Sequence, residues 1–496
     1  SYTKSLIKVG CREMDRIFEN FYREKEGELF EDISKLIAIP SVAKAHEKEK
    51  DAPYGTAVKK GLDYVLQRGK ELGFETVNYD NQVGEIITGS GKNTVGILCH
   101  VDVVDAGDGW TTDPFKAELI DGELYGRGAI DDKGPLVCSL YAMKYLEEYN
   151  NIPDNCRIKM IIGTDEEEDW ESIGYYLQQK PELPTFSIVP DANFPVIYCE
   201  KGLANLELIL PIGDDGKEQK EGCFNITQLS GGERSNVVAA NAMCRIESSN
   251  PAFDFERGIA FIEDFSNTME ISIEAEQDES ALNIKVFGRA AHAMTPEKGK
   301  NAISYLMKLL KEMSLKCGIY FAQQEIIDFY DKYIDLQYDG KNLGLKCSDN
   351  DSGDLTLNVG ILKLEEHCVS MKINLRYPVS YGLNQIKSKL AQVTDSEGAS
   401  IKYGVCMDPI FFPKDSPLVE TLMDVYQKIT GDETTEPIAL GGATYARAIP
   451  QAIAFGPVFP TQEELAHEAD EHYTFADYKK ITKIYAEAIM RLFAIF

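Results

Sequence analysis

The stretch "ILCHVDVVDAGDGW", residues 97–110, places a histidine and an aspartate two residues apart, directly after an apolar run. The apolar run predicts a buried β-strand, and in a strand the side chains of His100 and Asp102 point to the same face. Taken alone, such a pair is more typical of the polar end of a strand than of a metal site. Its meaning depends on whether other strands of the chain end in similar residues.

Three further apolar runs in the first half of the chain end in acidic residues. Asp131 and Asp132 follow "LYGRGAI", Glu166 and Glu167 follow "KMIIGT", and Asp191 follows "FSIVP". Open α/β sheets bind ligands at the carboxyl ends of their strands, so these side chains are expected to converge. Histidine nitrogens and carboxylate oxygens suit zinc, cobalt or manganese. The pattern favours metal-assisted hydrolysis, in which one of two adjacent glutamates binds a metal and the other acts as a base.

The periodicity of apolar residues divides the chain into three parts. Helical spacing alternates with short β-type runs up to about residue 202, with helices expected at 14–36, 55–73 and 134–149. The next part, up to about residue 412, shows β-type alternation with a helical segment near 300–313. The helix and strand pattern then returns and ends in a helix near 475–494.

These parts predict an α/β fold with two domains. A chain of 496 residues exceeds the roughly 250 to 300 residues at which one hydrophobic core stops growing. Strand-end motifs occur on both sides of the middle part. We therefore expect a discontinuous α/β catalytic domain of residues 1–202 and 413–496, and an inserted α+β domain of residues 203–412.

The composition argues against several classes of function. Acidic residues outnumber basic ones 81 to 51, and no basic run stands out, so nucleic acid and anionic membranes are not expected partners. No apolar run approaches the roughly 18 residues of a membrane span, and the first residues lack the apolar region of a signal peptide. The eleven cysteines are scattered without a CxxC pair, which is typical of a reducing compartment. A cytoplasmic location is expected.

Five segments in this order resemble the M20 metallopeptidases, and in particular their long bacterial dipeptidases of the PepV type. They are "GILCHVDVVDAGDGWTTDPFKAELIDGELYGRGAIDDKGP", "GTDEEEDW", "VPDANFP", "GRAAHAMTPEKGKNA" and "AHEADE". Each motif alone is weak to moderate, but together they span almost 400 residues in the family's order.

The resemblance implies a site with two divalent metal ions, zinc being expected and manganese or cobalt being alternatives. It implies that Asp131 bridges the two ions, that His100 and Asp191 complete one metal, and that Glu167 and His467 complete the other. It also implies that Asp102 orients His100, that Glu166 is the general base, and that the peptide bond after Asp131 is cis.

The inserted domain of the family supplies groups that contact the substrate. By resemblance, His292 in "GRAAHAMTPEKGKNA" steadies the oxyanion, Asn236 in "GGERSNVV" contacts the substrate carbonyl, and Arg376 in "NLRYP" binds the substrate carboxylate. Gly442 and Thr444 lie in "GGATYAR", which is similar to a glycine-rich loop beside the carboxylate pocket. Without the resemblance, the sequence favours a turn residue at Asn236 and a surface charge on a strand at Arg376.

The resemblance points to hydrolysis of small dipeptides with a free amino end and a free carboxylate. Asp191 favours this substrate class, since relatives that take N-acylated or carboxypeptidase-type substrates tend to carry glutamate at that position. The insert of about 210 residues implies a monomer, because shorter relatives dimerise through their lids. The alternatives are a deacylase that acts on N-acylated amino acids, such as a succinyl-diaminopimelate-like substrate, and an inactive binding protein of the same fold.

Overall fold

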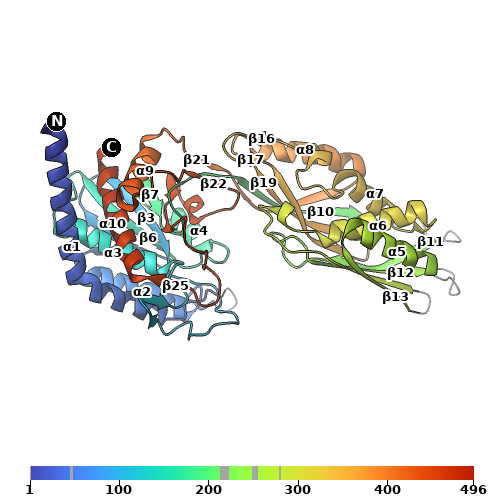
Figure 1. Cartoon of the computed structure of the whole chain (residues 1–496), viewed down its shortest axis with the longest axis horizontal. Coiled ribbons are helices and arrows are strands. Elements are labelled where there is room, and N and C mark those ends of the chain that lie inside the picture. Colours follow the sequence, from blue (N-terminus) through green and yellow to red (C-terminus); the bar gives the residue numbers. More distant parts are fainter. Residues whose placement is uncertain (1, 45–47, 213–222, 249–254, 279–280) are drawn as a thin grey trace. The chain divides into compact units, whose positions relative to one another are not determined.

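The computed structural model describes residues 2–44, 48–212, 223–248, 255–278 and 281–496. It separates into two compact units (Figure 1). Unit 1 comprises Ser1–Tyr198, Phe412–Ile438 and Thr444–Phe496, and unit 2 comprises Cys199–Phe411 and Ala439–Ala443. The short segment Ala439–Ala443 thus belongs to unit 2, whereas the domains expected from the sequence assign it to the catalytic part.

The centre of unit 1 is a mixed sheet in which strands follow the order β1-β2-β6-β3-β7-β23. Strands β6, β3, β7 and β23 run parallel to one another, while β1 and β2 form an antiparallel edge. Strand β3 is buried from its second residue to its last, as the continuous apolar run predicts for a strand covered on both faces. The bounds of these strands are β1 Glu75–Tyr79, β2 Val83–Gly89, β3 Asn93–His100, β6 Cys156–Gly163, β7 Phe186–Val189 and β23 Ala452–Ala454.

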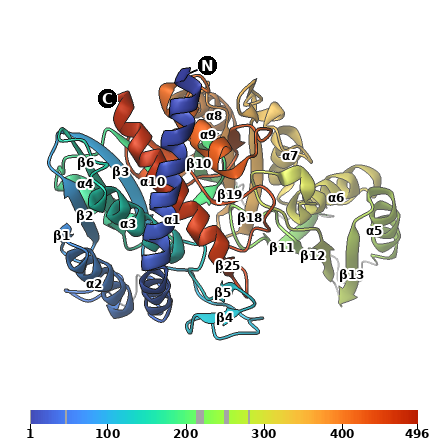
Figure 2. The same ribbon diagram turned by 60° about the vertical axis from the view of Figure 1, so that its left-hand side comes forward.

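Helices and short strands complete unit 1. Helix α3 packs on β2 and β3, and α1 and α10 pack in turn on α3 (Figure 2). The helices are α1 Tyr2–Ile37, α2 Thr56–Glu71, α3 Lys133–Glu148, α4 Glu171–Gln178, α9 Pro417–Thr430 and α10 Phe475–Leu492. Two small sheets join β4 (Glu118–Ile120), β5 (Glu123–Tyr125) and β25 (His472–Thr474), and β8 (Ala192–Asn193) with β24 (Pro457–Val458).

Unit 2 is a sheet with helices packed into one hydrophobic core. The strand order is β13-β14-β12-β11-β18-β19-β10-β20, and helices α5 to α8 contribute to the same core cluster (Figure 1). The strands are β10 Gly202–Pro211, β11 Cys223–Gly231, β12 Asn241–Ser248, β13 Ser272–Asp278, β14 Ala281–Phe287, β18 Thr356–Leu364, β19 Cys368–Tyr377 and β20 Ser400–Met407. The helices are α5 Glu256–Met269, α6 Ala302–Lys316, α7 Gln324–Tyr333 and α8 Leu383–Glu397.

Short elements complete the chain. Strands β9 (Ile197–Glu200), β21 (Ile410–Phe411) and β22 (Ile438–Leu440) lie where the chain passes from one unit to the other. In unit 2, β15 (Tyr320–Phe321) pairs with β11, and β16 (Ser348–Asp349) pairs with β17 (Gly353–Asp354).

The α/β class predicted from the sequence is confirmed, and all three helices expected in the first part are present. Within the described part of the chain, none of the helices combines the length and the apolar character that crossing a bilayer requires.

Candidate metal centre

The predicted ligands meet at one edge of the sheet of unit 1. Strands β3, β6 and β7 are parallel and therefore end at the same edge, where the residues that follow them carry polar side chains. Asp131 arrives from the loop before α3, and His467 arrives from the loop between β24 and β25. The residues that gather at this edge are His100, Asp131, Glu166, Glu167, Asp191 and His467.

Asp131 lies between the two histidines. Its Oδ1 atom is 3.0 Å from Nε2 of His100, and its Oδ2 atom is 3.0 Å from Nε2 of His467. Oε1 of Glu167 lies 3.1 Å from the same Nε2 atom of His467. One carboxylate therefore presents one oxygen to each of two ligand groups, which is the arrangement a bridging ligand requires.

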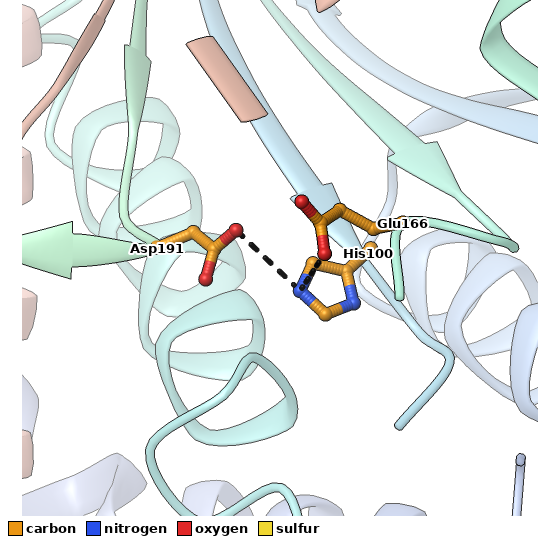
Figure 3. A group of neighbouring side chains, drawn as sticks. All are labelled: His100, Glu166 and Asp191. Carbon is orange, nitrogen blue, oxygen red and sulfur yellow. Dashed lines mark ion pairs between the residues drawn. The ribbon is translucent and has the colours of Figure 1, made fainter. Parts of the chain in front are cut away.

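Two further carboxylates face His100. In Figure 3, the side chains of Asp191 and Glu166 both point toward Nε2 of the ring, at 3.6 and 4.0 Å. Ligand atoms of His100, Glu166 and Asp191 lie within 4.8 Å of one another, and so do those of His100, Asp131 and Glu167. Geometry alone therefore allows Glu166 to be either a metal ligand or a base beside the metal.

The chemistry of these groups fits a cation. Nε2 of His100 and Oδ1 of Asp131 are buried and lie 3.0 Å apart, but neither atom makes a well-directed hydrogen bond to any described residue. Buried polar atoms are rarely left in this state unless a group that is not part of the chain satisfies them. Several carboxylates that converge on the same few ångströms repel one another, and bound divalent ions remove that repulsion.

The pKa values of the site reflect burial and crowding of like charges. Burial, followed by the charge of Asp131, raises the pKa of Asp191 to about 6 against the opposing effect of His100, and raises that of Glu167 to about 8. Hydrogen bonds to Asp131 and Glu167 raise the pKa of His467 to about 11. Burial would also raise the pKa of Asp131, but the two histidines that lie 3.0 Å from its carboxylate oxygens lower it below the usual range. Metal binding at neutral pH must therefore displace protons.

Asp102 holds the backbone of the two glutamates. Its carboxylate is fully buried and accepts hydrogen bonds from the backbone N–H groups of Glu166 at 3.1 Å and Glu167 at 3.0 Å. It also lies beside His100, whose Nδ1 is 3.0 Å from the Asp102 carbonyl oxygen and 3.4 Å from its carboxylate. The sequence pattern predicts the contact with His100 but not the bonds to the glutamates, which join residues 64 and 65 positions apart.

The residues next to the ligands are also fixed by buried carboxylates. Asp132 accepts a hydrogen bond from the backbone N–H of His100 at 3.1 Å, and the peptide bond between Asp131 and Asp132 is cis, as expected. Asp165 is 1% exposed and accepts hydrogen bonds from the backbone N–H and the hydroxyl of Ser172. The acidic run "DEEED" is therefore a turn that is anchored by the buried Asp165, while Glu168 and Asp169 are exposed.

The predicted substrate residues on the inserted part all lie in unit 2. His292 pairs with Val237 in a β-bridge, and its Nδ1 accepts a hydrogen bond from the backbone N–H of Met294 at 3.1 Å. Desolvation and, to a lesser extent, the charge of Arg376 lower the pKa of His292. The ring is therefore neutral near pH 7 with its proton on Nε2, which leaves Nε2 as a hydrogen-bond donor. Asn236 is exposed, immediately before the bridge.

Arg376 is buried rather than on the surface. It lies in β19 between β10 and β18, is 5% exposed, and its Nε donates a 2.9 Å hydrogen bond to Asn374. Gly442 lies close to Met294, two residues after His292, and Thr444 caps the short helix Tyr445–Ala448 by accepting from the N–H of Ala446. Gly442 belongs to unit 2 and Thr444 to unit 1, so the predicted loop "GGATYAR" is divided between the two.

Histidine and carboxylate side chains gathered at the strand ends of an α/β unit form the kind of site found in metal-dependent hydrolases. Residues 96–491 match the sequence model of Peptidase family M20/M25/M40, and the chain belongs to this family. The expected family is thus confirmed. The chain is 36% identical over 480 residues to "Putative dipeptidase YtjP" of Bacillus subtilis (strain 168), covering 95% of this chain and 98% of the relative. It is 34% identical over 474 residues to "Putative dipeptidase SAB1611c" of Staphylococcus aureus, with the same coverage.

Solved structures share the fold at low sequence identity. The aminopeptidase PepT from Bacillus cereus is 15% identical with a TM-score of 0.55, and the match covers 94% of this chain and 98% of that one. The dipeptidase Dug1p from Saccharomyces cerevisiae is 14% identical with a TM-score of 0.54, covering 96% and 97%. These likenesses extend over both units of the chain.

Proposed function

We propose that this protein is a metal-dependent dipeptidase, which hydrolyses dipeptides that have a free amino end and a free carboxylate. The observation that carries the proposal is Asp131, whose two oxygens each lie 3.0 Å from the Nε2 atom of a different histidine. The names of the two relatives, which cover almost the whole chain, support peptide hydrolysis and the dipeptide class.

The metal ligands in this proposal follow the geometry. Asp131 would be shared, His100 and Asp191 would hold one divalent ion, and Glu167 and His467 would hold the other. Zinc is the proposed metal, and manganese or cobalt are the alternatives that suit the same ligands. When bound, such ions polarise a carbonyl group and lower the pKa of water.

Glu166 is the proposed base. Its carboxylate takes a proton from the attacking water and returns it to the nitrogen of the departing amine. Burial, followed by the charge of Asp191, raises the pKa of Glu166, which makes its carboxylate a stronger base than that of an exposed glutamate. Asp102 keeps this side chain in place through the N–H of Glu166 and orients His100.

Unit 2 supplies the proposed contacts to the substrate. His292 donates from Nε2 to the oxyanion, a role that is typically worth about 3 to 4 kcal/mol of transition-state stabilisation. Arg376 binds the substrate carboxylate with its planar guanidinium, and Asn236 contacts the carbonyl. Gly442 of unit 2, together with Thr444 of unit 1, is proposed to line the side of the carboxylate site.

The test uses chelated protein with zinc or manganese added back, and a small panel of dipeptides. Wild type is compared with Glu166→Ala and with Glu168→Ala, which removes an exposed carboxylate from the same acidic run. We expect metal-restored cleavage in wild type and Glu168→Ala, and none in Glu166→Ala despite normal metal content. Loss of metal from Glu166→Ala would make Glu166 a ligand instead. Cleavage confined to substrates with a blocked amino end would replace the dipeptidase by a deacylase.

We further propose that the enzyme acts as a cytoplasmic monomer. The scattered cysteines, of which those described are free, suit a reducing compartment. The large insert supports the monomer, which light scattering of the purified protein would test.

A further inference from the structure

A buried carboxylate outside the proposed ligand set joins the segments that carry two of the ligands. Glu471 lies four residues after His467 and is fully buried. Its side chain accepts hydrogen bonds from the backbone N–H groups of Gly128, Ile130 and Asp131, the closest at 2.8 Å. Its own carbonyl oxygen accepts a further bond from the N–H of Gly126 at 2.9 Å. Backbone N–H groups of the segment 126–131 thus bond to one residue, Glu471, of the chain that follows His467.

Arg127 completes this arrangement. Its guanidinium is 1% exposed and donates to Glu471 at 2.8 Å, and also to the carbonyl oxygen of Ala106 at 3.1 Å. The guanidinium further lies 5.2 Å from the ring of Trp110. Arg127 therefore ties the same carboxylate to the loop that follows His100. A buried, charged pair of this kind requires good geometry, since neither partner can be removed without leaving a buried charge.

The hydrogen bond from the N–H of Asp131 connects Glu471 and Arg127 directly to a proposed metal ligand. Asp131 presents one oxygen to His100 and the other to His467, so a shift of its backbone changes both distances together. Glu471 fixes that backbone, and the same residue fixes the loop from which His467 projects. We propose that Glu471, held by Arg127, is a positioning residue that sets the spacing of Asp131 and His467 and so the affinity for the second metal ion; this inference rests on the proposed function.

The test is Glu471→Gln, which keeps the size of the side chain. The amide offers a single acceptor oxygen and turns an NH2 group toward N–H donors, so bonds to the segment 126–131 are lost. The matched control is Glu85→Gln. Glu85 is also buried in unit 1, at 2% exposed, and is paired with a cation, Lys159, at 2.9 Å, but it accepts from Tyr176 rather than from a ligand-bearing loop.

The measurement is titration of metal-free protein with Zn²⁺ in competition with a chromophoric chelator, together with the visible absorption of the Co²⁺-loaded protein. We expect Glu471→Gln to bind one of two ions at least tenfold more weakly, within the range usual for residues that support ligands, and to change the Co²⁺ spectrum. Glu85→Gln should match wild type in both readouts. Equal Zn²⁺ affinities for the two variants would overturn the inference.

Arg127→Lys is the second variant, which serves if Glu471→Gln does not fold. It keeps the charge but not the fork of donors. Weaker Zn²⁺ binding by Arg127→Lys supports the inference, and unchanged binding overturns it. Because the titration does not depend on turnover, weakened binding supports the inference even if wild type cleaves no dipeptide, a result that would overturn the proposed function alone.

Discussion

Replacing Asp102 by asparagine should reduce both activity and metal affinity, although Asp102 is not a proposed ligand. Its buried carboxylate accepts from the N–H groups of Glu166 and Glu167, at 3.1 and 3.0 Å. Asparagine has one acceptor oxygen, so one of these bonds is lost and one N–H is left unpaired. Hydrogen bonds to a charged group contribute about 1.5 to 3 kcal/mol each. At about 1.4 kcal/mol per factor of ten, we expect kcat/KM to fall roughly 10- to 100-fold.

The assay compares Asp102→Asn with Asp32→Asn at saturating zinc. Asp32 is 4% exposed, and its carboxylate accepts from Tyr64, Tyr141 and Arg68 at 2.7 Å each, away from the ligands. Both variants should unfold at a lower temperature than wild type, but only Asp102→Asn should lose kcat and zinc affinity. If Asp102→Asn keeps the kcat and zinc affinity of Asp32→Asn to within a factor of two, the reasoning is refuted.

Three further results are expected. Asp131→Asn should weaken binding of both metal ions, since each carboxylate oxygen faces a different histidine; isothermal titration with zinc would count the sites, and two intact sites would contradict the shared role. In the metal-free protein, the pKa of Asp191 is raised to about 6 and that of Glu167 to about 8. The protonated carboxyls therefore contribute to the stability of the fold below about pH 4, and this contribution is lost as the pH rises through those two pKa values. Zinc should therefore raise the unfolding temperature more at pH 8 than at pH 5.5 in calorimetry, and the opposite order would show that these carboxyls do not control binding. His292→Ala should lower kcat roughly 10²- to 10³-fold with unchanged metal content, whereas a change confined to KM would argue against oxyanion stabilisation.

Much of the fold was predictable because the patterns in this chain are local. The apolar run of 94–100 gave a buried parallel strand, and the helical spacing of 134–149 gave a helix within one residue of Lys133–Glu148. The segment Ala439–Ala443 was not predictable in the same way. It belongs to unit 2 through contacts such as the bond from the N–H of Lys201 to the carbonyl of Leu440, and no periodicity in the sequence encodes a pairing over that separation.

The candidate site was predictable where chemistry coincides with strand ends. His100 ends one parallel strand, and Glu166 and Asp191 follow two others, so their convergence results from the direction of the strands alone. Asp131 was also predicted because it follows an apolar run, but that run forms only the short strand β5 and the loop before α3 rather than a strand of the central sheet, and its shared role needed the resemblance. His467 needed the resemblance altogether. The environment of Arg376 was not accessible to sequence, because a charge in an alternating strand is usually exposed, whereas this one is 5% exposed.

The sequence motifs at the site contain more acidic residues than metal binding alone requires, and the structure shows what the additional carboxylates do. Three carboxylates that are not proposed ligands each accept a hydrogen bond from the backbone N–H of a residue that is a proposed ligand. Asp102 accepts from Glu166 and Glu167, Asp132 accepts from His100, and Glu471 accepts from Asp131. Each of these bonds joins segments that are distant in sequence, so the ligand-bearing loops hold one another in place.

This arrangement also explains why bound cations are needed to offset the repulsion between the carboxylates of the site. The carboxylates that fix the backbone are themselves buried beside the carboxylates of the ligands, which adds negative charge to a site already crowded with it. Hydrogen bonds from backbone N–H groups and from Arg127 offset part of this negative charge, and bound divalent ions would offset the rest. Rigidity and metal affinity would then have one origin, and a change such as Glu471→Gln should alter the metal sites before it alters the fold.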